Sequence, residues 1–178
     1  MLADEEEGDL SFRFAREEDV HMLTAFALKA HVETYLYHPL INTNAIISYI
    51  KENMNTTNIL KELKLENSKF LLCFNRSSVL VGYAKVNMDS TDFSEFFKEH
   101  SMEIQRFYVD SSFHRRGIGM QMLHQIRLLA KMRNLGTIWL TVWNKNTTAI
   151  EFYKTFDFIQ VHAVHKDIGT ALIMSLDL

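Results

Sequence analysis

The sequence predicts one domain of mixed α/β class, and three observations lead to this prediction. Residues 105–129 are typical of a strand, a glycine-containing loop and a long amphipathic helix. Residues 137–156 repeat the order of strand, turn and helix. Short segments near both ends of the chain add further strands. With 178 residues, of which 47% are hydrophobic, the chain can bury one well-packed core.

The remaining elements follow from apolar periodicity and from turn residues. The first half of the chain supplies a strand, two helices and a hairpin, at residues 11–15, 17–31, 45–54, and 69–75 with 79–88. The second half supplies two central strands, two helices and a final antiparallel pair, at residues 102–109, 118–130, 137–143, 148–156, and 159–164 with 171–176. We therefore expect residues 10–178 to form a single domain, because no linker, low-complexity tract or repeat divides them.

The ends of the chain and its apolar runs bear on location. Residues 1–9 are acidic and terminal, so we expect them to be mobile. The longest clean apolar run, residues 70–74, is far shorter than the ~20 residues that span a bilayer. The acidic start is unlike the basic start of a signal peptide. We expect a cytoplasmic protein with no membrane partner.

Charge and side-chain chemistry exclude several functional classes. A net charge of −3 argues against nucleic acid as the main partner and suits a cationic substrate better. The acidic residues of the stretch 89–103 are consistent with a solvated surface or with attraction of a polyamine. The single cysteine, Cys73, lies in an apolar run and is expected in the core. His162 and His165 lack partners at ligand spacing, so we expect no metal site.

The loop before the long helix has the chemistry of an anion site. Gly117 and Gly119 bracket the start of the helix, where free backbone N–H groups and the helix dipole favour negative charge. Arg115 and Arg116 add positive charge beside these amides. No Gly-Lys-Ser/Thr follows, and one glycine of the dinucleotide fingerprint is missing. The loop predicts a site for a diphosphate outside those two families.

Three stretches of the chain together resemble a known family. Val109, the loop 115–119, and residues 146–153 followed by Phe158 resemble the acetyl-CoA-binding core of the GNAT N-acetyltransferase superfamily. The closer resemblance is to the PaiA-type spermidine/spermine N-acetyltransferases. It is carried by residues 82–87, 104–109, 138–146 and 149–154.

This resemblance implies a fold and a binding mode. The GNAT fold has a mixed sheet of about six to seven strands flanked by helices. Its two central strands are parallel and splay apart, which leaves strand N–H and C=O groups free to pair with the pantetheine arm of acetyl-CoA. No metal is implied. The implied cofactor-binding residues are Phe107, Tyr108, Val109, His114, Arg115, Arg116, Gly117, Ile118, Gly119, Met120, Asn146 and Tyr153.

The implied reaction is transfer of an acetyl group from acetyl-CoA to a primary amine by direct attack, with a polyamine or other small amine as acceptor. Tyr153 would be the general acid at the sulfur. Relatives carry a glutamate general base where this chain has Gln105, and an amide cannot take a proton at neutral pH. Glu103, two residues earlier on the same strand face, is the best substitute, although a solvated carboxylate would look the same.

Other departures and alternatives remain open. His114 stands where the family has Gln or Arg, and Asp157 stands where a glycine is usual, which Asp can replace in left-handed backbone. The segment with Tyr35, Tyr37 and His38 would line the acceptor side or serve in packing. The alternatives in function are a protein N-terminal or lysine acetyltransferase and a non-catalytic acetyl-CoA-binding regulatory module. A homodimer would be in keeping with the family.

Overall fold

The computed structural model describes residues 10–36, 43–88, 93, 95–97, 100–166 and 169–178. Within these residues, seven strands form one mixed sheet in the order β1-β2-β3-β4-β5-β7-β6. The strands are β1 Ser11–Phe14, β2 Ser68–Phe74, β3 Leu80–Met88, β4 Ser101–Val109, β5 Thr137–Trp143, β6 Ile159–Lys166 and β7 Gly169–Asp177. The β4–β5 pair is parallel and its neighbours are antiparallel. This architecture confirms the predicted mixed α/β fold.

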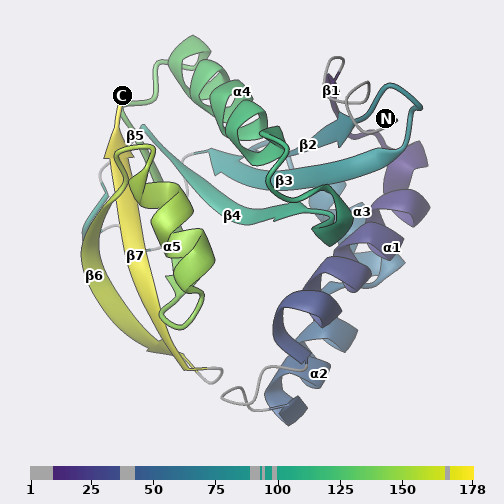
Figure 1. Cartoon of the computed structure of the whole chain (residues 1–178), viewed down its shortest axis with the longest axis horizontal. Helices are drawn as coiled ribbons and strands as arrows, with labels where there is room; N and C mark the ends of the chain where they lie inside the picture. Colours follow the sequence, from purple (N-terminus) through teal and green to yellow (C-terminus); the bar gives the residue numbers. More distant parts are fainter. Residues whose placement is uncertain (1–9, 37–42, 89–92, 94, 98–99, 167–168) are drawn as a thin grey trace, which may run out of the picture.

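Helices cover both faces of the sheet (Figure 1). Their bounds are α1 Val20–His31, η2 Val32–Leu36, α2 Thr43–Asn53, α3 Thr56–Leu63, α4 Ile118–Met132 and α5 Thr147–Lys154, with 3-10 turns η1 Glu17–Asp19 and η3 Ser111–Phe113. The helices α4 and α5 share one hydrophobic core with the sheet, and α1, α2 and α3 share another on the opposite face. The sheet therefore separates an α4–α5 face from an α1–α3 face.

The helix α3 was not predicted from the sequence, although the hairpin of β2 and β3 and the final pair of β6 and β7 were. The segment 1–9, predicted to be mobile, lies outside the described residues, as do Tyr37 and His38. Cys73 is 0% exposed, as predicted for a core residue, and burial raises the pKa of its thiol to about 12. No helix in the described ranges is long and apolar enough to cross a membrane.

The sheet opens between its two central strands, as predicted. The strands β4 and β5 pair from Ser101 with Thr137 to Ile104 with Leu140, where their pairing ends. Both strands continue beyond that point, β4 to Val109 and β5 to Trp143. Figure 1 shows the two strands running apart. The edge of β4 that faces β5 is consequently unpaired over residues 105–109.

A β-bulge in β4 decides which side chains face which helices. Val86 of β3 lies opposite Ile104, and the next residue, Lys85, lies opposite Arg106, so Gln105 has no partner across β3. The extra residue interrupts the alternation of side chains along β4. As a result Tyr108 packs with the α1–α3 core, whereas Ile104 and Phe107 belong to the α4–α5 core.

Candidate active site

The open edge of β4 presents backbone groups to the gap. The N–H of Asp110 donates to the carbonyl of Val81 at 2.9 Å, so the even-numbered residues at this end of β4 point toward β3. Phe107 and Val109 therefore direct their N–H and C=O groups toward the opening. The carbonyl of Val109 already accepts a hydrogen bond from His114 Nε2 at 2.9 Å. This contact places His114 against the strand edge, and its predicted phosphate role stays a prediction.

The glycine loop that follows has left-handed backbone at two positions. Arg115 has φ of 63° and Gly117 has φ of 73°, a value that glycine adopts without strain. Gly117 caps α4, whose first turn, Ile118 to Met120, offers N–H groups without acceptors inside the helix. The Arg115 and Arg116 side chains are exposed beside this turn, and the Arg116 guanidinium lies 5.2 Å from the centroid of the Phe113 ring. The loop has the charge and the donors of an anion site.

Gly119 lies where α4 packs closely against its neighbours, and its expected role beside a phosphate stays a prediction. A Cβ atom at this position would lie 3.3 Å from the Phe152 ring and 3.7 Å from the Phe107 ring. Gly119 therefore permits close packing of α4 against α5. The next residue, Met120, is 52% exposed and borders a hollow of about 400 Å³ on the outer side of α4. The hollow is lined by Met120, Gln121, His124, Gln125, Arg127 and Phe156.

The helix α5 brings Tyr153 to the opening on the α4–α5 face. Asn146 caps this helix, because its Oδ1 accepts from the N–H of Ala149 at 3.2 Å. Tyr153 is 7% exposed, and its ring packs 6.1 Å, centroid to centroid, from that of Phe107. Burial raises the pKa of Tyr153, and the neighbouring Tyr35 raises it further. The Tyr153 hydroxyl has no hydrogen-bond partner among the described residues, so its proton is available to a bound molecule.

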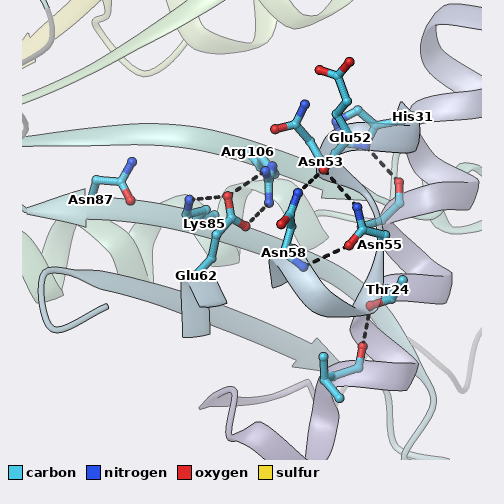
Figure 2. Close-up of polar contacts among 12 residues, drawn as sticks. Thr24, His31, Glu52, Asn53, Asn55, Asn58, Glu62, Lys85, Asn87 and Arg106 are labelled. Atoms are coloured by element: carbon cyan, nitrogen blue, oxygen red, sulfur yellow. Dashed lines mark hydrogen bonds and ion pairs between the residues drawn. The ribbon is translucent and has the colours of Figure 1, made fainter. Parts of the chain in front are cut away.

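The opposite face of the opening holds a buried ion cluster. The carboxylate of Glu62, on α3, lies 2.8 Å from Lys85 Nζ and 2.6 Å from Arg106 Nη1 (Figure 2). Arg106 Nη2 adds a second hydrogen bond to Glu62 at 3.0 Å. The side chains of Lys85 and Arg106 are each 4% exposed. Burial lowers the pKa of Lys85, while Glu62 opposes this effect.

Glu103, the predicted substitute base, lies on this face beside the cluster. It is 7% exposed, and its Oε2 accepts a hydrogen bond from Asn87 Nδ2 at 2.7 Å. Glu103 also interacts electrostatically with Lys85. The partly buried carboxylate of Glu62 and the buried one of Glu103 thus accompany two buried cations, so that the four formal charges sum to zero.

An aromatic cluster closes the α1–α3 face beside the opening. His31, at the end of α1, is 2% exposed, and its ring centroid lies 4.7 Å from that of Tyr108. His31 Nδ1 lies 2.8 Å from the carbonyl of Ala27, and Nε2 lies 3.2 Å from the Tyr108 hydroxyl. The rings of Tyr35 and Tyr49 pack around the same imidazole. The side chain of Tyr108 therefore lies away from the glycine loop with which it was grouped.

The structure divides the predicted residues between the two faces. One group, made up of Phe107, Val109, the glycine loop, Asn146 and Tyr153, borders the opening from the α4–α5 face. Glu103 and the Tyr108 side chain lie on the other face. Sequence reasoning missed three residues that organise that face: His31, Glu62 and Arg106. The Asn55 cap, with apolar residues four and five positions later, was the available signal for α3. The described residues contain no group of three or more potential ligands for a metal ion.

The sequence is similar to known acetyltransferases. A model of the acetyltransferase (GNAT) family matches residues 20–158. An uncharacterised N-acetyltransferase of Lactobacillus delbrueckii subsp. lactis is 31% identical over 74 residues, which are 42% of this chain and 42% of that protein.

Solved structures share the fold over nearly the whole chain. PaiA N-acetyltransferase from Thermoplasma acidophilum, solved in complex with coenzyme A, has a TM-score of 0.79 and 20% identity, covering 96% of this chain and 100% of that one. An acetyltransferase of the GNAT family from Staphylococcus aureus Mu50 has a TM-score of 0.71 and 15% identity, covering 95% and 99%.

Proposed function

Because the chain belongs to the acetyltransferase (GNAT) family, we propose that it transfers an acetyl group from acetyl-CoA to a primary amine, with a polyamine as the first candidate. The observation that supports this proposal is the opened β4–β5 pair, because the free edge of β4 is followed along the chain by the glycine loop at the start of α4, and Phe107 on β4 packs against Tyr153 of α5.

The residues present fit acetyl-CoA as the cosubstrate. The first turn of α4, with Arg115 and Arg116, would hold the diphosphate by charge and backbone N–H groups. The outward N–H and C=O groups of Phe107 and the N–H of Val109 would pair with the amides of the pantetheine arm, as a neighbouring strand would. Acetyl-CoA supplies an activated acyl group, and no covalent bond to the protein is needed.

The reaction needs a proton donor for the leaving sulfur and a proton acceptor for the amine. The amine nitrogen attacks the thioester carbonyl, a C–N bond forms, the C–S bond breaks, and its electron pair goes to sulfur. Tyr153 is the proposed donor of a proton to that sulfur, because its residue is 7% exposed and no hydrogen bond within the described residues holds its hydroxyl proton. A polyamine nitrogen arrives as an ammonium and loses one proton before it attacks, for which Glu103, directly or through a water, is the proposed acceptor. It loses a second proton once the C–N bond has formed, and this proton replaces the one that Tyr153 gave up.

The acceptor is proposed from charge. The net charge of −3 favours a cationic substrate, and Glu95, in the acidic stretch after β3, is exposed. Asp89, Asp92 and Glu99 of this stretch lie outside the described residues. The carboxylates of Glu62 and Glu103 are balanced by the buried cations beside them, so attraction of a polyamine would come from the acidic stretch.

The decisive experiment is release of free thiol from acetyl-CoA with spermidine, spermine, small monoamines and peptides, for the wild type and Tyr153→Phe. We expect turnover on a polyamine, a fall of about 10²-fold or more in kcat for Tyr153→Phe, and an unchanged Kd for acetyl-CoA by calorimetry. Turnover on peptides alone would assign the chain to protein acetylation. Equal activity of the two proteins would remove Tyr153 from the mechanism.

A second candidate is a non-catalytic module that binds acetyl-CoA and regulates another process. It is favoured by Gln105, which stands where the family has its base, and by Glu103, whose carboxylate is already hydrogen-bonded. Tight binding of acetyl-CoA without turnover on any amine would support this candidate. For the enzyme, an unchanged pH profile of kcat/KM in Glu103→Gln would exclude Glu103 as the base.

A further inference from the structure

The protonation state of His31 follows from its contacts. Its Nδ1 lies 2.8 Å from the carbonyl oxygen of Ala27, an atom that can only accept, so Nδ1 carries a proton. The ring is 2% exposed, and burial lowers the pKa of His31 to about 4. The imidazole is therefore neutral at pH 7, and its Nε2 has a lone pair and no proton.

This tautomer fixes the direction of the Tyr108 hydroxyl. Its oxygen lies 3.2 Å from His31 Nε2, which can only accept, so Tyr108 must donate its one proton there. The oxygen lone pairs of Tyr108 are then left to accept a hydrogen bond. The Tyr35 hydroxyl is 3.5 Å away, at the long limit for a hydrogen bond. The Tyr108 oxygen therefore keeps capacity to accept a stronger donor.

The position of Tyr108 connects this acceptor with the transfer chemistry. It lies on β4 beyond Ile104, in the segment that has no partner on β5. On the other face of the sheet, the ring of Phe107, the residue before Tyr108, packs 6.1 Å, centroid to centroid, from that of Tyr153.

We propose that Tyr108 contacts the acceptor amine, accepting a hydrogen bond from its N–H, and that His31 is a positioning residue which fixes the Tyr108 proton. Held in this way, the amine nitrogen can direct its lone pair toward the thioester. The partly exposed rings of Tyr35, Tyr49 and Tyr108 offer apolar surface to carbon atoms beside that nitrogen. The substrate class is a primary amine on an alkyl chain. This inference rests on the proposed function.

The first test compares Tyr108→Phe with Tyr83→Phe. Tyr83 is a matched control because its ring stacks 5.8 Å from that of Tyr108, and its buried hydroxyl has no partner among the described residues. With the best amine of the thiol-release panel, we expect Tyr108→Phe to lower kcat/KM for the amine about tenfold or more. The Kd for acetyl-CoA should not change, and Tyr83→Phe should behave as the wild type.

The second test separates the direction of the proton from simple packing at His31. In His31→Gln the side-chain amide oxygen can take the place of Nε2 and accept from Tyr108. In His31→Asn the shorter amide can keep the bond to Ala27 but cannot reach Tyr108. We expect His31→Asn to reproduce the kinetic loss of Tyr108→Phe, and His31→Gln to recover most of the activity.

The possible outcomes separate a failure of this inference from a failure of the proposed acetyl transfer. A wild type that acetylates an amine, with Tyr108→Phe equally active, would overturn the inference and leave the proposed function standing. Equal losses in His31→Gln and His31→Asn would overturn the positioning role of His31. A wild type inactive on every amine would overturn both.

Discussion

Glu62→Gln is the sharpest test of how the α1–α3 face is stabilised. The substitution preserves the shape of the side chain and removes its charge. The carboxylate of Glu62 lies within 2.8 Å of both Lys85 Nζ and Arg106 Nη1, whose side chains are each 4% exposed. Without this charge, the buried Lys85 and Arg106 lose the carboxylate that binds both of them. Removing one partner of a buried ion pair is costly because the remaining charge has lost its water and its counter-ion.

The magnitude follows from these contacts. Breaking a buried pair costs about 3–5 kcal/mol. The side chain of Glu62 is 20% exposed, and the glutamine oxygen can still accept one hydrogen bond. The cost of Glu62→Gln should therefore lie at the lower end of this range. We expect Glu62→Gln to lose about 3 kcal/mol of unfolding free energy. If the unfolding free energy falls by ~2 kcal/mol per molar urea, the urea concentration at which half of the protein is unfolded should fall by about 1.5 M.

The assay is equilibrium unfolding in urea followed by tryptophan fluorescence. Trp139 and Trp143 are 0% and 8% exposed, so both report on the loss of the core. Glu151→Gln is the matched control, because its carboxylate pairs with Lys154 on the surface, and it should change stability by less than ~0.5 kcal/mol. Adding Lys85→Met to Glu62→Gln should recover part of the loss. A loss below about 1 kcal/mol for Glu62→Gln would refute this account of the cluster.

Three further predictions concern single residues. Because burial lowers the pKa of His31 from 6.5 to about 4, the unfolded chain binds a proton in that window that the native protein does not. Stability should therefore fall by about 1.4 kcal/mol per pH unit from pH 6.5 toward 4, and His31→Gln should lack this component in urea titrations at several pH values. Gly117→Ala should cost about 1–2 kcal/mol, because φ there is 73°, whereas Gly136→Ala, with no atom within 4 Å of the added Cβ, should be neutral; thermal melts of the two variants compare them. The Cys73 thiol, 0% exposed and with a pKa raised to about 12, should react with a disulfide reagent at the rate of unfolding, and fast labelling of the native protein would contradict its placement.

The parts of the fold that the sequence predicted are those encoded in local spacing. The stretch from β4 through the glycine loop to α4 is one example, because the turn residues and the apolar stripe of α4 lie close together in the chain. Asp157 is another, since the expected left-handed backbone is confirmed by φ of 67°. The order of the strands and their parting were expected from family resemblance, because the partners of a strand are not visible in its own sequence.

The missed features depend on contacts between distant segments. His31 and Tyr108 are 77 residues apart, and nothing in their local spacing links them. The helix α3 is eight residues long and begins with Thr56 and other weak helix formers, so tertiary packing decides its formation. No glycine marks the bulge at Gln105, and without the bulge an alternating strand would have directed Arg106 and Tyr108 toward α4.

The parting of β4 and β5 also bears on aggregation. Unpaired strand edges are normally dangerous, because they offer a template to any exposed strand of another protein. Here the unpaired edge lies in the middle of the sheet, with α4 and α5 over one face and α1 over the other. A neighbouring sheet cannot approach such an edge, whereas a slender extended molecule can. The arrangement keeps backbone donors and acceptors ready for a ligand without exposing the protein to self-association along that strand.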